Sequence, residues 1–447
     1  MTNNPDDLLR RELGVRQLAA SIFNYTIGSG IFVMPALVAA QLGPAGILAY
    51  LVCGVVMALV ATCFAEAGSR VAVSGGPYAY VEAAMGPLPG FVAGALNVTA
   101  DIVTAAALAT IFAGSVAALT GAASAVVKVV LILSVFATVA AINVRGVSKG
   151  ARLIETLLTA KLVPLVVFVV AGAVFVRPAS LAWTFTPSAR SVLGTAGILI
   201  FAYTGIEGAL QPSGEVRAPA RTVPRAAFVA IGGITAFYVA IHLVAQGILG
   251  PALAGSQAAP LADAAAAFSG PAGRNVMLAT VILSIFATLS GQVLAGPRTL
   301  FAFGRDGLAP RSLAFVHASF RTPHVAIVTF AAIAAALAIS GTFEQLAILS
   351  NVGALSVYAL SAISAWMLRR RDVRTNGDPF VAPGGPLVPL LACTAIGWML
   401  VETATRIEWA ALAIVVIISL AIYALRARRA HMSTQSRERS TAFRHPR

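Results

Sequence analysis

The sequence predicts an all-α membrane protein with twelve transmembrane helices, which form a 5+5 inverted repeat followed by two extra helices. Three observations support this fold: the apolar composition, the succession of long apolar runs, and glycine-containing breaks at matching places in two runs. Hydrophobic residues make up 58% of the 447 residues and charged residues 11%, with a mean hydropathy of +0.87. Because about a quarter of the residues in a soluble domain are charged, we expect this chain to lie mostly in a lipid bilayer.

The apolar runs set the number of helices. About 20 apolar residues in a helix cross the hydrocarbon core of a bilayer. Runs of this kind occupy residues 16–39, 45–67, 88–118, 124–143, 152–176, 192–213, 226–249, 275–301, 325–341, 345–368, 385–402 and 408–426.

The basic residues set the orientation. If both termini lie on one side, that side holds 25 of the 31 lysines and arginines, and the opposite side holds five. Short loops rich in Lys and Arg stay in the cytoplasm, so we expect a multi-pass protein of the cell inner (plasma) membrane with both termini cytoplasmic. No signal peptide is predicted, since the N-terminus is polar and no small-residue cleavage site follows the first run.

The runs divide the chain into units. Residues 1–15 form a cytoplasmic N-terminus, 16–176 the first repeat, 192–368 the second repeat, 385–426 the last two helices, and 427–447 a basic cytoplasmic tail that we expect to be disordered. Five helices are an odd number, so the two repeats have opposite orientations, and each opens with a broken helix. Inverted repeats of this kind enclose a site near the bilayer midplane.

Several other classes of protein are excluded. The net charge of +14 does not indicate nucleic-acid binding, because the basic residues lie in short loops and form no groove-binding motif. The five histidines form no zinc pattern, the three cysteines have no metal spacing, and no Walker-type loop or nucleophile–base pair stands out. We therefore predict neither an enzyme nor a cofactor or metal site.

The first break is the stretch Gly28-Ser29-Gly30. A helix that stops in mid-membrane leaves backbone N–H groups without partners, and the positive end of the half-helix that follows suits a carboxylate. Glycine permits close approach of the backbone, and Ser29 adds a hydroxyl. Taken alone, these residues would also suit a packing notch between two helices.

The second break surrounds Gly205, about 177 positions after the first. Carbonyl groups freed there could hold a substrate ammonium, and Phe201 and Tyr203 could cover a ligand, although ordinary aromatic packing explains both rings nearly as well. Glu207 lies inside the break, where it either titrates or holds the broken helix in place. Two breaks at matching places are typical of the binding site of a secondary transporter.

Two further ionisable residues lie inside predicted helices. Lys161 lies roughly 13 Å along the fifth run, too deep for its side chain to reach water fully. Burial favours the neutral amine, so Lys161 is a candidate proton carrier, while a charged Lys161 could instead brace the first broken helix. Asp101, one turn after Asn97, could pair with a cationic group of the substrate or with an internal donor such as Lys161.

These stretches resemble the amino acid–polyamine–organocation (APC) superfamily over roughly residues 10–426. The string Ile27-Gly28-Ser29-Gly30-Ile31-Phe32 resembles the glycine-rich motif that binds the substrate carboxylate in that family. Residues 201–207, Phe201-Ala202-Tyr203-Thr204-Gly205-Ile206-Glu207, resemble the motif of the sixth helix. Residues 215–225 and 298–310 are similar to the family's loops after the sixth and eighth helices.

The resemblance implies an amino acid permease that works by alternating access without ATP. By position, Phe201 matches an aromatic gate, and Lys161 matches a fifth-helix lysine of proton-coupled and sodium-independent members. Asp101 falls where arginine–agmatine exchangers carry an asparagine, which tilts the prediction toward a cationic substrate. The expected proton-coupling residues are Lys161 and Glu207. The expected substrate-binding residues are Ile27, Gly28, Ser29, Gly30, Asp101, Phe201, Ala202, Tyr203 and Gly205.

Proton-coupled transport of an amino acid or related amine is therefore the favoured function. Obligate exchange is the second mechanism, and a polyamine or another organic cation is the second class of substrate. A membrane sensor would need a soluble signalling domain, for which no segment is long enough. A channel is disfavoured, because two matched breaks suit an occluded site better than a continuous pore.

Overall fold

The computed structural model describes residues 14–28, 30–71, 76–122, 124–145, 147–183, 185–210, 216–305, 307–320, 322–374 and 378–442. These residues form helices and connecting loops, without a β-strand among them. The α-helices are α1 (Val15–Thr26), α2 (Gly30–Leu42), α3 (Ile47–Arg70), α4 (Pro77–Met85), α5 (Pro87–Thr120), α6 (Ala125–Val144), α7 (Val147–Gly172), α8 (Ala189–Leu199), α9 (Ile206–Leu210), α10 (Pro219–Leu249), α11 (Pro260–Arg305), α12 (His324–Ser340), α13 (Phe343–Arg370), α14 (Leu387–Thr403) and α15 (Arg406–Ala442). The 3₁₀ helices are η2 (Gly43–Gly46), η3 (Ala173–Phe175), η4 (Pro178–Leu181), η5 (Ile200–Tyr203), η7 (Gly250–Gly255) and η8 (Arg311–Ala314).

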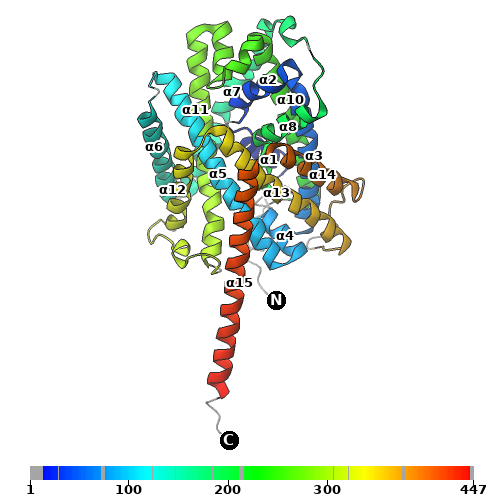
Figure 1. The fold of residues 1–447 in the computed structure, drawn as a ribbon, viewed down its shortest axis with the longest axis vertical. Coiled ribbons are helices and arrows are strands. Elements are labelled where there is room, and N and C mark those ends of the chain that lie inside the picture. Colours follow the sequence, from blue (N-terminus) through cyan, green and yellow to red (C-terminus); the bar gives the residue numbers. More distant parts are fainter. Residues whose placement is uncertain are drawn as a thin grey trace.

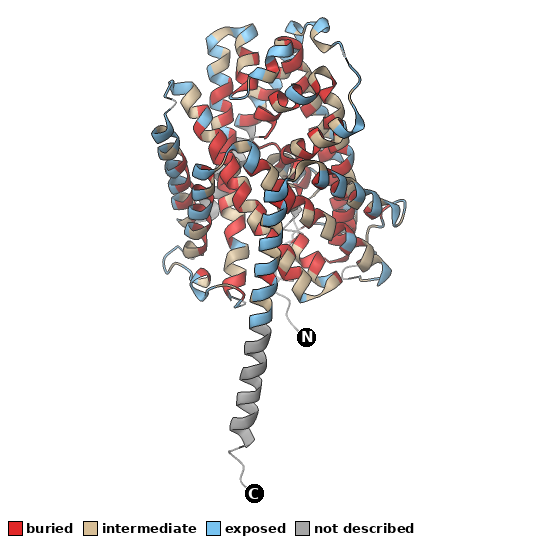
Figure 2. Ribbon diagram, viewed as in Figure 1, coloured by how far each residue is buried: buried red, intermediate tan, exposed pale blue. Residues whose placement is uncertain are grey.

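The outer surface of the helices is apolar. Within the described chain, eight segments are long and apolar enough to cross a membrane, and three shorter apolar helices accompany them. Val126 of α6 is 72% exposed, Val170 of α7 67% and Ile407 of α15 78%, and Figure 2 shows the buried residues gathered inside the bundle. An apolar surface of this extent is stable in lipid rather than water, so the chain is a multi-pass membrane protein.

The centre of the bundle is built by long helices that lie close together. α3 packs along α10, α5 packs against both α11 and α13, and α6 lies beside α12 at one edge (Figure 1). Glycines allow the close approach. A Cβ atom at Gly54 of α3 would lie 2.6 Å from Thr235 Oγ1 on α10, and one at Gly353 of α13 would lie 3.0 Å from Ala100 Cβ on α5.

Three elements differ from the sequence prediction. α4 is a short helix in a region predicted as a loop, and α11 begins at Pro260, well before the predicted start, with a kink at Gly270 where φ is 69°. α15 runs as a helix from Arg406 to Ala442, past the end of the last predicted apolar run at residue 426.

Helical structure is interrupted near both predicted breaks. α1 ends at Thr26 and α2 begins at Gly30, while Ser29 lies outside the described residues. In the second stretch, α8 leads through η5 to Thr204 and Gly205, and α9 then begins at Ile206. Gly205 has a φ of +122°, a conformation that glycine adopts at low cost and other residues do not.

A buried ion cluster joins α3 to the end of α13. Arg70 donates from Nη2 to Glu66 Oε1 at 3.2 Å, and the two side chains are 3% and 2% exposed. Arg369 Nη1 lies 3.7 Å from Glu66 Oε2, which also accepts a hydrogen bond of 3.2 Å from the backbone N–H of Ala382. The Glu66 carboxylate therefore ties α3 to α13 and to the segment that follows α13.

Replacing Glu66 with alanine should lower the free energy of unfolding by about 3–5 kcal/mol, because Arg70 would lose its buried carboxylate partner, whereas Asp372, 3.9 Å from Arg70, is largely exposed. The control is Arg190→Ala, which removes an ion pair with Glu402 in which Arg190 is 80% exposed. That change should cost less than about 1 kcal/mol. Thermal unfolding of the purified protein in detergent compares the two variants, and equal losses would contradict the role given to Glu66.

Candidate functional site

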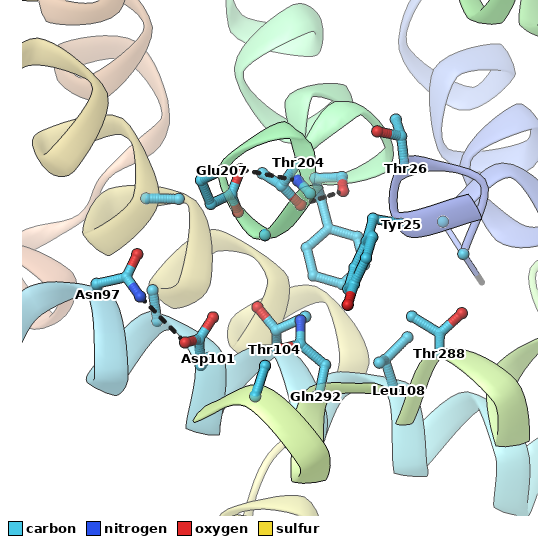
Figure 3. A pocket seen from close by; sticks show the side chains of 18 of the residues that line it. Tyr25, Thr26, Asn97, Asp101, Thr104, Leu108, Thr204, Glu207, Thr288 and Gln292 are labelled. Atoms are coloured by element: carbon cyan, nitrogen blue, oxygen red, sulfur yellow. Dashed lines mark hydrogen bonds between the residues drawn. The ribbon is translucent and has the colours of Figure 1, made fainter. Parts of the chain in front are cut away.

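The two interruptions lie against each other beside a cavity of about 50 Å³ (Figure 3). A Cβ atom at Gly30 would lie 2.8 Å from Ala202 Cα, and one at Gly205 would lie 2.8 Å from the carbonyl carbon and oxygen of Tyr25. The two backbones are thus in direct contact. The cavity is lined by Tyr25, Thr26, Gly28, Gly30, Asn97, Ala100, Asp101, Thr104, Leu108, Phe201, Thr204, Gly205, Glu207, Gly208, Thr288, Gln292, Ala295, Ala354 and Tyr358.

The first interruption presents the start of α2 to the cavity through Gly28 and Gly30. N–H groups in the first turn of a helix have no partner within the helix, and they give this end a partial positive charge. The carbonyl of Gly28 is engaged elsewhere, because Ser284 Oγ donates to it at 3.3 Å. The arrangement suits a carboxylate placed at the start of α2.

The second interruption is held by Glu207. Its Oε2 accepts hydrogen bonds from the N–H of Gly205 at 3.0 Å and from the hydroxyl of Tyr358 at 2.5 Å. These bonds fit a carboxylate that holds the interrupted helix in place. Phe201 lines the cavity as well, and its ring packs edge to face on Phe343 with 5.5 Å between the ring centroids. Phe201, held by this ring contact, forms part of the cavity wall.

Asp101 faces the cavity from α5. Its Oδ2 accepts a hydrogen bond of 3.1 Å from Asn97 Nδ2, and Figure 3 shows Asp101 across the cavity from Glu207. Asp101 thus has an internal donor, which is Asn97 and not the Lys161 suggested from the sequence. The described lining residues include these two carboxylates and no lysine, arginine or histidine. An excess of acidic groups suits a cationic part of a ligand.

Lys161 lies outside the cavity and is fully buried. Its Nζ donates to the carbonyl oxygen of Asn24, in the last turn of α1, at 2.9 Å. The last carbonyl groups of a helix have no partner within it, and a cation at this end complements the helix dipole. Lys161 is therefore bonded to the end of α1, one residue before Tyr25 of the cavity wall.

The structure separates the predicted site residues into three groups. Gly28, Gly30, Asp101, Phe201, Gly205 and Glu207 line one cavity. Ile27, Lys161, Ala202 and Tyr203 are buried without lining it, and Tyr203 directs its hydroxyl away to donate to the Tyr50 carbonyl at 3.0 Å. Ser29 lies outside the described residues.

Several polar lining residues were not among the predicted site residues, including Tyr25, Thr104, Thr288, Gln292 and Tyr358. A signal for Thr104 is present in the sequence, since Asn97, Asp101 and Thr104 follow one another at helical spacing on α5 and share a face. Polar residues on one face of a membrane helix point to the bundle interior. Tyr25 and Tyr358 carry no comparable local signal.

Comparison with known proteins then identifies the family. Residues 13–424 match the family model described as "Amino acid permease". The chain belongs to the amino acid permease family. This agrees with the predicted resemblance to the APC superfamily, which is confirmed, and family members are transporters rather than enzymes.

Three relatives resemble the permease along most of their length. It is 28% identical to the methylthioribose transporter of Bacillus subtilis over 439 residues, or 94% of each chain. It is 27% identical to the branched-chain amino acid permease BcaP of Bacillus subtilis over 407 residues, or 86% of each chain. It is 28% identical to the serine/threonine exchanger SteT of Bacillus subtilis over 409 residues, which cover 89% of this chain and 92% of that one.

The Gly205→Ala substitution should strongly reduce substrate binding and uptake, because the new Cβ would lie 2.8 Å from the Tyr25 carbonyl at a φ of +122°. The matched control is Gly194→Ala in α8, where a Cβ atom meets nothing within 4 Å. Alanine there should raise stability by up to about 1 kcal/mol and leave transport intact. Uptake into reconstituted vesicles compares the two, and full activity of Gly205→Ala would show that the backbone contact is dispensable.

Proposed function

We propose that the permease is a secondary active amino acid transporter of the plasma membrane, coupled to protons and working by alternating access. The observation that carries this proposal is one cavity lined by two chain interruptions about 177 positions apart. Interrupted helices at matching places in two halves are a feature of inverted-repeat transporters, in which one part rocks against another around a fixed site.

The helix bounds support twelve membrane spans. The apolar segment Gly30–Arg70 contains α2 and α3, which η2 separates. Counting these two separately, together with the other long segments and the three shorter apolar helices, gives the number predicted from the sequence. The first repeat then begins with the α1–α2 interruption, the second repeat with the α8–α9 interruption, and both termini lie in the cytoplasm as the basic residues indicate.

An amino acid fits the charges of the cavity in one orientation. Its carboxylate would lie at the start of α2, near Gly28 and Gly30, where helix N–H groups point toward an anion. Its ammonium would lie toward Asp101, and the Phe201 ring would cover its side chain. Two of the relatives are named for amino acids, the branched-chain permease and the serine/threonine exchanger, which favours this substrate class.

Lys161 is the proposed proton carrier. A protonated amine holds the Asn24 carbonyl with a charge-assisted hydrogen bond, and a neutral amine holds it less strongly. Because Asn24 adjoins Tyr25 of the cavity wall, gain and loss of this proton would shift the balance between two arrangements of α1. Glu207 is the second proposed proton site, next to the other interruption.

Obligate exchange and transport of an organic cation are the alternatives. A Lys161 that stays charged would brace α1 without releasing a proton, and one relative is named an exchanger. The two carboxylates of the described cavity wall, with no basic side chain among the lining residues, favour a polyamine or other cation over a zwitterion. The experiments below separate these alternatives from the favoured function.

Uptake into proteoliposomes should be measured for a labelled panel of neutral amino acids, cationic amino acids and polyamines, with and without an inward proton gradient. We expect gradient-dependent accumulation of one amino acid class. Uptake that occurs only into preloaded vesicles would favour exchange, and accumulation of polyamines alone would favour the organic-cation alternative. The Asp101→Asn variant should reduce uptake of cationic substrates more than uptake of neutral ones.

Replacing Lys161 with alanine should abolish proton-driven accumulation and leave exchange of internal for external substrate, because exchange needs no net proton movement. The control is Lys128→Ala, which removes an exposed lysine from α6. Accumulation and exchange should both be measured in the same vesicles. Accumulation that survives in Lys161→Ala with unchanged pH dependence would rule out the coupling role.

A further inference from the structure

A fully buried histidine lies on α10, outside the cavity. His242 is 0% exposed. Neither ring nitrogen makes a hydrogen bond of good geometry with a described residue, and the polar group beside the ring is the backbone of Gly43. Buried polar groups nearly always have a partner in the protein or an ordered water. The Gly43 backbone can serve one ring nitrogen, so the other nitrogen is a place for ordered water or for an exchange of protons.

The imidazole lies directly beneath the turn between α2 and α3. A Cβ atom at Gly46 in η2 would lie 2.6 Å from His242 Nε2, so the ring is in contact with this turn. Gly43 and Pro44 of the same turn are only half-buried. In the proposed topology, one short turn thus separates His242 from the membrane face opposite the termini.

Three tyrosines, Tyr50, Tyr203 and Tyr238, connect His242 with the two interruptions on the side away from η2. The Tyr50 ring lies 5.1 Å from the His242 ring between centroids, and the Tyr50 hydroxyl also lacks a partner among the described residues. Tyr203 donates to the Tyr50 carbonyl at 3.0 Å and packs edge to face on Tyr238 with 5.2 Å between centroids. Buried hydroxyls without protein partners are places where ordered water binds.

Tyr238 connects this line to both interruptions. Its hydroxyl oxygen lies 3.0 Å from the Thr26 carbonyl oxygen and 2.9 Å from the Ala202 carbonyl oxygen. A hydroxyl has one proton, so it donates to one of these carbonyls at a time. Thr26 lines the cavity, and its own buried hydroxyl has no partner among the described residues. Tyr203 thus links Tyr50 to Tyr238 through a backbone hydrogen bond and a ring contact, and Thr26 forms part of the cavity wall.

We propose that His242 passes protons between the η2 face of the membrane and the cavity, along Tyr50, Tyr238 and Thr26 with ordered water. This inference rests on the proton-coupled function proposed above. Water on the η2 side gives a proton to one ring nitrogen, and the proton on the other nitrogen leaves toward the cavity, where a carboxylate accepts it. Loss of that proton leaves a neutral ring with its proton on the opposite nitrogen, and rotation of the ring then restores the starting arrangement. Imidazole suits this step because each nitrogen can accept or donate a proton near neutral pH.

The charged groups of the protein do not explain the position of His242. Tyr50 is the titratable side chain that faces it from α3, while α2 and η2 contribute Val38 and Gly46, which carry no charge. Along α10 itself the polar neighbours are Tyr238 and Gln246. No ion pair between His242 and another described residue is present, so a pH response at this place would come from the imidazole.

The test compares wild type with His242→Gln in proteoliposomes, at external pH values from about 5 to 8. Glutamine keeps hydrogen-bonding capacity and carries no proton. We expect at least about a tenfold loss of proton-driven uptake and a flatter pH profile, while exchange of internal for external substrate stays near the wild-type rate. Tyr50→Phe should give the same selective loss. His317→Gln, a change in the loop before α12, should leave the rate and the pH profile of wild type.

The outcomes separate this inference from the proposed function. Wild-type protein without any proton-driven uptake would overturn the coupling and the proton route together. If uptake by the wild type is proton-driven and uptake by His242→Gln is unchanged, the proton route is wrong and the proposed coupling stands. An equal loss of exchange and proton-driven uptake in His242→Gln would show that the imidazole only packs, which also overturns the route.

Discussion

The contact between the two interrupted backbones is the constraint on which the rest of the structure depends. Gly30 meets Ala202, and Gly205 meets Tyr25, at distances that leave no room for an added methyl group. Peptide groups freed by an interruption cannot be satisfied by hydrocarbon. They are stable here because each interruption lies against the other and against polar groups of the surrounding helices, which fixes the place of the cavity.

The polar groups that support the interruptions come from different helices. Lys161 of α7 bonds the Asn24 carbonyl, Ser284 of α11 bonds the Gly28 carbonyl, and Tyr358 of α13 bonds Glu207. The cavity therefore lies where several helices meet, and a shift of any of them changes a bond at its wall. Support of this kind by several helices fits the alternating access proposed above.

The two acidic residues of the cavity differ in what they can do. Glu207 Oε2 already accepts two hydrogen bonds from the protein, whereas Asp101 accepts a hydrogen bond from Asn97 on its own helix. An amide neutralises no charge, so Asp101 retains the stronger attraction for a cation in the cavity. Glu207 thus has the contacts of a residue that holds the second interruption, and Asp101 is the carboxylate better placed for the proposed ligand.

The sequence by itself determined the membrane class, the succession of apolar helices and the positions of the two interruptions, because lipid requires long apolar runs and an interruption within one requires glycine. It also placed six residues that line the cavity. Only the tertiary structure decided which neighbouring side chains face inward. Phe201 and Tyr203 are two residues apart, yet Phe201 lines the cavity and Tyr203 bonds Tyr50. Tyr25 and Tyr358 join the site because helices distant in the sequence pack together, and no local pattern of apolar residues records that contact.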